Sequence, residues 1–449
     1  MKILLVKSFS GHNLDAVFPI GLSYIAGALD GHEVRALDTN VEQDHLVKLE
    51  TIMQEFCPDV VGIMIRNIWP FRYGSNLSPY YKDGIIPIIK IIKSSGSARL
   101  VIGGPGFTAY SREIMEDLPE VELGVFREGE DTFKELVGNL DSPDKVKGVY
   151  YRKDGKVNFT GAREFKSVEE LPMPKWDVFD VDKYKDLFGS MGVQTKRGCA
   201  LKCAYCVYPY LCGYKISSRP AVKVVDEIEY LSNRYGIKDI VFVDTIFNVP
   251  HKHAVEICNE LSERKLGVAW TAWFHPKHIT EEFVRQAVDA GCYLFEFSPD
   301  AYSDKMLRLL HKNIKKQDII KTYKIIKKTE GANIAYNFFF NGPGANILTF
   351  IQLLFFYLRV RIFLGPKLKR FFFSRLHIEP NTELCSLALE KGMIDKNTKF
   401  LGSQEIYRKL IYRESVLVDL VFAARNRIKS IRKKTMCRIK NLFNKSGQS

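Results

Sequence analysis

Short apolar runs alternate with helical patterns along the first part of the chain. The runs KILLV, HEVRALD, DVVGIMI and RLVIGG have the length and the β-branched content of buried strands, whereas IGLSYIAGAL and IIPIIKIIK have helical spacing. Strands that alternate with helices form a parallel sheet with helices on both faces. Residues 1–140 are therefore predicted to be one doubly wound α/β domain of Rossmann type.

The loops that follow these strands are the expected ligand site, because the carboxyl ends of parallel strands meet at one edge of the sheet. Their sequences are SFSGHN, RNIWPFRYG and GGPGFT. Gly103, Gly104 and Gly106 in the third loop have no side chains, so a ligand can approach the backbone closely.

A second alternation follows the stretch LPMPKWDVFDVDKY, whose prolines and weak periodicity are typical of a linker. Its strand patterns are GVQTK, DIVFVD, VAWTAWF, YLFEFSP, ANIAYNFFF and FFFSRLHI. Six strands separated by helices predict an incomplete (β/α)6 barrel, a partial TIM barrel with its active site at the carboxyl ends of the strands. We assign residues 141–184 to the linker, 185–385 to the barrel and 386–449 to a helical C-terminal extension.

Composition and charge indicate a folded protein that is not expected to bind nucleic acid. The 449 residues are 46% hydrophobic and 26% charged, which is typical of folded domains. The start, MKILLVKSFSG, has the pattern of a buried strand rather than of a secretory signal, so we expect a cytoplasmic protein. Residues 424–449 contain nine Lys or Arg and no acidic residue, which leaves only +5 of the net charge of +14 for the rest. Nucleic acid is therefore not an expected partner.

Three cysteines lie close together in RGCALKCAYC, on the loop expected after the first barrel strand. In a chain without an export signal, such spacing points to metal binding rather than to disulfides. Cys199, Cys203 and Cys206 suit an iron–sulfur cubane whose fourth iron stays open to a small molecule. A structural zinc site, with Cys212 as fourth ligand, is the alternative that spacing leaves open.

The three cysteines, with Tyr205 just before the last, resemble the signature of the radical S-adenosylmethionine superfamily. Further segments, over residues 1–390, are similar to the subgroup with an amino-terminal cobalamin-binding domain. They are PIGLSYIAGAL, VIGGPGFT, FREGEDTFKEL, VFVDTIFN, AYSDKMLRLLHK and EPNTELCSLALEKGMI. The resemblance implies a [4Fe-4S] cluster on the three cysteines, S-adenosylmethionine on its open iron, an external one-electron donor and a cobalamin cofactor.

The resemblance also implies roles for single residues. Tyr205, Asp244 and Asp300 correspond to positions that contact S-adenosylmethionine, although a helix-capping role is the alternative for Asp300. The implied cobalamin contacts are Gly103, Gly104, Pro105, Glu128, Gly129 and Glu130. The loop DTNVEQD has no histidine that would ligate cobalt from below.

Two segments predict contact with a lipid surface. Residues 347–364 are apolar except for a few positions, Arg359 and Arg361 among them, which favours a buried or interfacial helix over a membrane span. Ile428 and Ile431 recur at helical spacing among the basic residues of the tail, as in a helix that binds anionic lipid. A solvated helix packed on the enzyme is the alternative for the tail.

We therefore predict an oxygen-sensitive enzyme, cytoplasmic or peripheral to a membrane. It would cleave S-adenosylmethionine reductively, abstract hydrogen from an unactivated carbon and methylate a lipid-like or natural-product substrate with the help of cobalamin. Two alternatives remain open at this point: a cobalamin-dependent radical cyclase or rearrangement enzyme without methyl transfer, and a non-catalytic, zinc-stabilised binding protein anchored by its tail.

Overall fold

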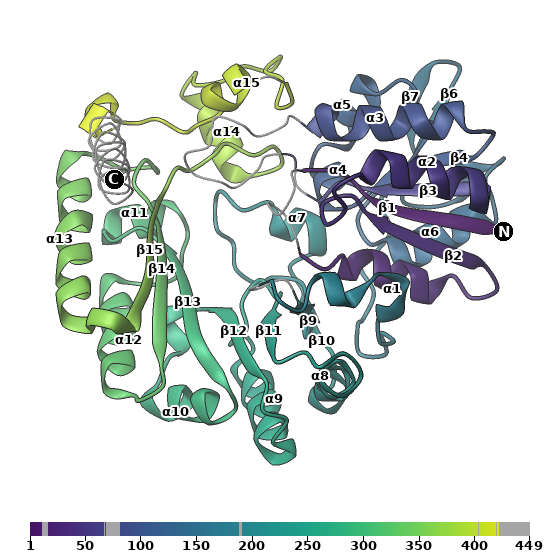
Figure 1. The fold of residues 1–449 in the computed structure, drawn as a ribbon. Helices are drawn as coiled ribbons and strands as arrows, with labels where there is room; N and C mark the ends of the chain where they lie inside the picture. Colours follow the sequence, from purple (N-terminus) through teal and green to yellow (C-terminus); the bar gives the residue numbers. More distant parts are fainter. Residues whose placement is uncertain are drawn as a thin grey trace, which may run out of the picture.

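The computed structural model describes residues 1–10, 17–66, 68, 81–187, 191–402, 404–418, 420 and 421. Two α/β halves stand side by side, and the segment after the second sheet contacts both of them (Figure 1). The predicted order, a doubly wound domain followed by an incomplete barrel, is confirmed. The basic tail at 424–449 and the loop residues 11–13 and 69–74 lie outside the described residues.

The first half is a seven-stranded sheet in the order β2-β1-β3-β4-β5-β6-β7. Its strands are β1 (Lys2–Lys7), β2 (Glu33–Asp38), β3 (Val60–Met64), β4 (Arg99–Gly103), β5 (Leu123–Val125), β6 (Val149–Lys153) and β7 (Lys156–Phe159). The first five are parallel, whereas β6 and β7 add antiparallel. The sheet therefore extends past residue 140, into the segment expected to be a linker.

Helices cover both faces of this sheet. α1 (Ile20–Ala28) and α6 (Gly129–Val137) pack on one face, and α2 (His45–Phe56), α3 (Tyr81–Ser94) and α5 (Ser111–Asp117) on the other. Successive residues of β1 point to opposite faces, so Ile3 and Leu5 join one apolar core and Leu4 and Val6 the other. The strand order reverses between β1 and β3, and such a reversal is where doubly wound sheets bind ligands.

The second half is a parallel six-stranded sheet in the order β8-β11-β12-β13-β14-β15. Its strands are β8 (Gly192–Val193), β11 (Asp239–Phe242), β12 (Ala269–Phe274), β13 (Cys292–Asp300), β14 (Asn333–Phe339) and β15 (Leu368–Ser374). Its helices are α8 (Ala221–Tyr235), α9 (His251–Arg264), α10 (Glu281–Asp289), α11 (Asp304–Leu309), α12 (Lys316–Lys328) and α13 (Ile347–Leu364). All six predicted barrel strands are present in their predicted order.

The segment between the halves is packed rather than free. Trp176 and Tyr184 each contact the ring of Phe18, at centroid distances of 4.6 and 5.2 Å. Beyond β15, α14 (Glu383–Glu390) and α15 (Gln404–Lys409) form the extension. There the backbone N–H of Leu401 donates to Glu113 of the first half at 2.8 Å. The segments before and after the barrel thus both join it to the first half.

A buried ion pair joins the ends of β1 and β2. The Lys7 ammonium lies 3.2 Å from an Asp38 carboxylate oxygen, and both side chains are 1% exposed. The same carboxylate oxygen accepts the Tyr184 hydroxyl at 2.7 Å, which ties the linker to the sheet. Burial lowers the pKa of Lys7 to about 8, against the opposing influence of Asp38.

We expect Asp38→Ala to destabilise the protein by about 3–5 kcal/mol, because it removes the carboxylate that offsets a buried ammonium. Arg112→Ala is the control, since Arg112 forms an exposed ion pair with Glu116 at 3.2 Å and should contribute at most about 1 kcal/mol. Urea unfolding of both variants would measure the difference. Equal midpoints for the two variants would contradict the expectation.

Candidate active site at the cysteine loop

The three clustered cysteines lie on one loop, residues 198–207, which we call the cysteine loop. It follows β8 and the short strand β9 (Lys196–Arg197) and leads into α7 (Tyr208–Cys212). Gly198 opens the loop at φ +88°, where a Cβ would overlap the carbonyl oxygen of Lys215 beside β10 (Ser217–Ser218). Only glycine therefore fits this turn.

The three thiols share a desolvated environment. Cys199 is buried, and Cys203 and Cys206 are partly exposed. Burial raises the pKa of Cys203, and raises that of Cys206 to about 12, with the neighbouring cysteines adding to both shifts. In the part of the chain that the structure describes, no group of three or more His, Cys, Asp or Glu side chains is placed to hold a single metal ion.

One buried ion pair anchors the strand that leads into the cysteine loop. Asp244, just past the end of β11, lies 3.1 Å from the Lys196 ammonium, and the two side chains are 0% and 2% exposed. The other carboxylate oxygen accepts the backbone N–H groups of Thr195 and Lys196 at 2.8 and 3.1 Å. Asp244 thus fixes the approach to Cys199 from the neighbouring strand.

A second buried ion pair anchors the middle of the cysteine loop. Asp300, at the end of β13, lies 2.6 Å from the Lys312 ammonium, and the two side chains are 1% and 8% exposed. The same Asp300 oxygen accepts the Tyr205 hydroxyl, and the other accepts Ser298 Oγ at 2.8 Å. The Tyr205 ring packs edge-on against Phe339 at 5.2 Å. Tyr205 is therefore held on its hydroxyl and on its ring.

The structure brings the predicted Tyr205 and Asp300 together and places Asp244 on the other side of the cysteine loop. Asp300 has φ +68°, so it does not act as an ordinary helix N-cap, and Ser303 caps α11 instead. The carboxylate oxygens of Asp244 and Asp300 already accept hydrogen bonds from other groups of the protein. Contact of Tyr205, Asp244 and Asp300 with S-adenosylmethionine stays a prediction.

A turn of the first half that contains Glu128 and Glu130 binds β9, the strand that leads into the cysteine loop. Arg197 lies 3.3 Å from a Glu128 oxygen and 2.5 Å from a Glu130 oxygen. Gly129 between them leaves room for α1, because a Cβ there would lie 2.8 Å from the side chain of Ile25. The predicted cobalamin contacts at this turn therefore form part of the contact between the halves.

The glycine loop lies at the same edge of the first sheet. Gly103 ends β4, Gly104 has φ +95°, and Pro105 begins the short helix α4 (Pro105–Ala109). A Cβ on Gly104 would lie 2.7 Å from the carbonyl oxygen of Ile65, so the loop is tight against the chain that leaves β3. Nearby, Arg127 donates to the carbonyl oxygen of Tyr210 at 3.0 Å. The carboxyl ends of the first sheet thus face the segment that follows the cysteines (Figure 1).

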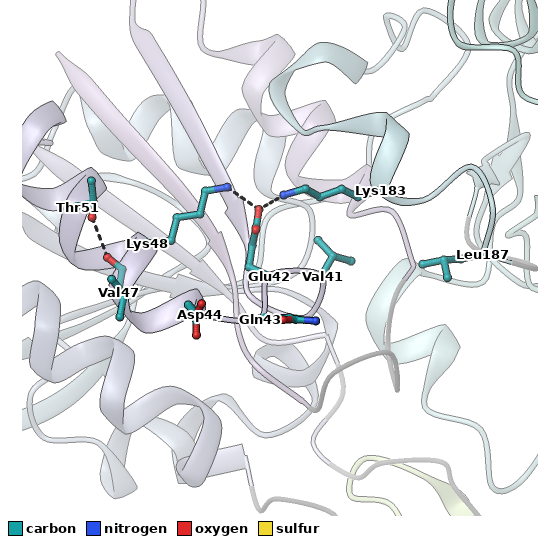
Figure 2. Close-up of a pocket in the computed structure, with 9 residues that line it drawn as sticks. All are labelled: Val41, Glu42, Gln43, Asp44, Val47, Lys48, Thr51, Lys183 and Leu187. Carbon is teal, nitrogen blue, oxygen red and sulfur yellow. Dashed lines mark hydrogen bonds and ion pairs between the residues drawn. The ribbon is translucent and has the colours of Figure 1, made fainter.

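A cavity of about 670 Å³ opens beside the end of β2 and the linker. Glu42 projects into it and is bonded by Lys48, at 2.7 Å, and by Lys183 (Figure 2). The cavity includes most of the loop that lacks a histidine, and none of the predicted cofactor residues lines it.

Sequence reasoning missed the basic residues of the site. Lys196 and Arg197 directly precede Gly198 in QTKRGC, and basic residues next to clustered cysteines are a usable signal. Lys312 ends the segment AYSDKMLRLLHK, whose similarity to the subgroup was noted without a role for this lysine.

Comparison with known proteins gives a consistent result for both halves. Residues 14–137 match the B12 binding domain family, and residues 193–357 match the radical SAM superfamily. The chain is 30% identical, over 73% of its length and 72% of the relative's, to an uncharacterised methyltransferase of Pyrococcus horikoshii. It is 26% identical, over 76% and 72% of the two chains, to a cytidylyl-2-hydroxyethylphosphonate methyltransferase of Streptomyces wedmorensis.

A solved structure has the same fold. It is the radical S-adenosylmethionine methyltransferase TsrM from Kitasatospora setae, with cobalamin and a [4Fe-4S] cluster bound. The TM-score is 0.76 at 22% identity, over 88% of this chain and 79% of that one. The arrangement of the two halves is therefore a known one.

We expect Lys312→Met to destabilise the apoprotein by about 3–5 kcal/mol, because it leaves the Asp300 carboxylate buried without its cation. The double variant Lys312→Met, Asp300→Asn should regain most of this loss, since it buries no charge. Lys202→Met, which removes an exposed lysine of the same loop, is the control. Thermal unfolding would compare them, and a Lys312→Met protein as stable as Lys202→Met would refute the anchoring role.

Proposed function

Because the chain belongs to the radical S-adenosylmethionine superfamily, in the subgroup with an amino-terminal cobalamin-binding domain, we propose that it methylates an unactivated carbon of a small organic substrate. As a member of this family it is an enzyme, and its cofactors are a [4Fe-4S] cluster, S-adenosylmethionine and cobalamin. The observation that carries the proposal is that β9, which leads directly into the cysteine loop, binds the acidic residues after the last parallel strand of a B12 binding domain.

The donor set of the cysteine loop fits an iron–sulfur cluster. Cys199, Cys203 and Cys206 are three thiols in a desolvated loop after the first barrel strand. Each cysteine of a cubane binds a different iron, so the three sulfurs need not meet at one point. Burial disfavours free thiolates, and coordination to iron supplies the positive charge that stabilises them. We assign these three residues as the cluster ligands.

The strand ends of the first half fit a large planar cofactor. The sheet order reverses between β1 and β3, and the edge beyond this reversal faces the cysteine loop. Gly103 and Gly104 present backbone without side chains at this edge. We propose that Gly103, Gly104 and Pro105 contact cobalamin, and that Glu128 and Glu130 act mainly through Arg197, by holding the two halves together.

When bound, the cluster would supply the electron for the reductive cleavage of S-adenosylmethionine to methionine and a 5′-deoxyadenosyl radical, and methylcobalamin would supply the methyl group. The chain's own residues position these groups. Lys196 and Asp244 fix the start of the cysteine loop, and Lys312 and Asp300 fix Tyr205 within it. We propose that S-adenosylmethionine binds in contact with Tyr205, Asp244 and Asp300. The side chains of Asp244 and Asp300 are 0% and 1% exposed, so these two residues act chiefly through the backbone that they hold in place.

The substrate we propose is lipid-like or a natural product. The named relative from Streptomyces wedmorensis acts on a small phosphonate conjugate, which supports a small-molecule substrate. The long apolar helix α13 and the basic tail support a lipid-like one. We further propose a cytoplasmic enzyme whose tail, residues 424–449, contacts an anionic membrane surface, and a separate one-electron donor protein.

We expect Cys203→Ala to abolish cluster binding, because two cysteines do not hold a cubane with one open iron. Anaerobic reconstitution with iron and sulfide should give a brown wild-type protein that forms 5′-deoxyadenosine under reduction, and a colourless variant that forms none. Cys212→Ala is the matched control and should keep full iron content. A wild type that holds only zinc, or equal iron loss in both variants, would overturn the cluster assignment.

We expect Gly104→Val to lower the cobalamin bound per polypeptide while leaving the iron content unchanged. The glycine has φ +95°, and a Cβ would lie 2.7 Å from Ile65 O, so the loop must shift. Gly155→Val is the control, since Gly155 has φ +72° but nothing within 4 Å. A wild type that neither retains nor binds cobalamin would remove the methylation proposal and leave the radical chemistry standing.

A further inference from the structure

Helix α13 is buried along one side only. It connects β14 to β15 on the outside of the barrel, and Phe350, Leu353, Phe356, Val360 and Leu364 on its inner side lie in the core. Phe356 stacks on Tyr302 at a centroid distance of 4.0 Å. These inner residues make α13 an integral part of the barrel.

The outer side of α13 is also apolar, although it faces solvent. Five large side chains on it are exposed: Leu348 by 65%, Ile351 by 39%, Phe355 by 68%, Leu358 by 50% and Ile362 by 82%. Their spacing of three and four residues places them in one row along the helix, which we call the α13 stripe. Large apolar rows are rarely left in water on a soluble domain without a partner.

Length and composition would allow residues 347–367 to cross a membrane, and this is the one such helix in the described part of the chain. Its inner side is packed against the barrel strands, however, so the helix cannot be surrounded by lipid while the barrel is folded. A partner can therefore reach α13 from the outer side alone.

Basic residues stand beside the stripe. From Lys316 to Arg370 the chain contains ten Lys or Arg and two acidic residues, although Lys328 and Arg370 pair with Glu281 and Glu296 outside this segment. Lys327 lies over the ring of Phe363, at 5.7 Å from its centroid, and Arg361 donates to the Tyr357 hydroxyl at 2.7 Å. Lys327 and Arg361 thus place two cations beside the apolar surface of α13.

The chain returns to α13 before its basic tail begins. Glu414 accepts the backbone N–H of Gly344, immediately before the helix. Val416, Leu417 and Leu420 follow with 73%, 53% and 61% of their surfaces exposed. The apolar surface therefore continues from the start of α13 into the segment that leads to nine further Lys or Arg.

The positive charge near the α13 stripe indicates which kind of partner it binds. The tail and a second copy of the chain would each place positive charge against positive charge, which opposes association. An anionic lipid surface matches both features, since apolar side chains enter the boundary between headgroups and acyl chains while Lys and Arg meet the phosphates. In Figure 1, α13 lies on the side of the barrel away from the first half, so a membrane there leaves the contact between the halves free.

We propose that the α13 stripe and its basic surroundings form a docking surface for an anionic lipid bilayer. The enzyme then lies on the membrane through a structured element of its barrel, and the tail adds attraction. This proposal concerns the outside of the barrel and does not depend on the reaction proposed above.

The test is sedimentation of the full-length protein with vesicles of phosphatidylcholine alone or mixed with phosphatidylglycerol. Wild type should bind the mixed vesicles, and binding should weaken at high salt. Phe355→Glu combined with Ile362→Glu should reduce the bound fraction by roughly tenfold or more. Val47→Glu, at a position 62% exposed on α2 of the first half, should bind like wild type.

Further measurements control for folding and compare the bilayer with the two other possible partners, the tail and a second copy of the chain. Iron content and thermal unfolding should match wild type in the α13 variant, which separates lost docking from lost folding and from any failure of the proposed chemistry. Wild-type binding by the α13 variant, together with loss of binding on deletion of residues 424–449, would overturn the proposal in favour of the tail alone. A wild-type dimer that becomes monomeric in the α13 variant, without vesicle binding by either, would overturn it in favour of a second copy.

Discussion

Two buried lysine–aspartate pairs hold the cysteine loop in shape, and the proposed chemistry depends on that shape. Lys196 pairs with Asp244 before the cysteines, and Lys312 pairs with Asp300 beneath Tyr205. Burying four charges is unfavourable unless each is paired and hydrogen-bonded, and the described contacts supply both. Each pair joins the loop region to a strand end or helix farther along the barrel.

The same strand that carries Lys196 also carries Arg197, and this neighbour binds the other half of the molecule. Glu128 and Glu130 accept Arg197 at the edge where the B12 binding domain meets the barrel. One short strand thus fixes the cysteine loop on one side and the first half on the other. Radical enzymes with two cofactors need such a fixed spacing, because reacting groups must be held within close reach.

Much of the fold was predictable because its signals are local. Four parallel strands of the first sheet and most of the barrel strands are apolar runs of ordinary length. Three strands of the first sheet were not predicted: β5 has only three residues, and β6 and β7 are short and half-exposed, so their pattern differs little from that of a loop. The spacing of the three cysteines alone predicted a metal site, whereas the preference for a cluster over zinc rested on the resemblance. The lysine anchors were not predicted, since the role of Lys312, in the loop between α11 and α12, follows only from its ion pair with Asp300 at the end of β13.

The anchors also bear on how the enzyme is assembled. Lys312 lies more than a hundred positions after Cys199 in the sequence, yet it sits beneath the cysteine loop. A nascent chain that has emerged only as far as α10 holds all three cysteines and the Lys196–Asp244 pair, but neither Asp300 nor Lys312. The anchoring of Tyr205 is therefore complete only when the chain has been synthesised beyond α11.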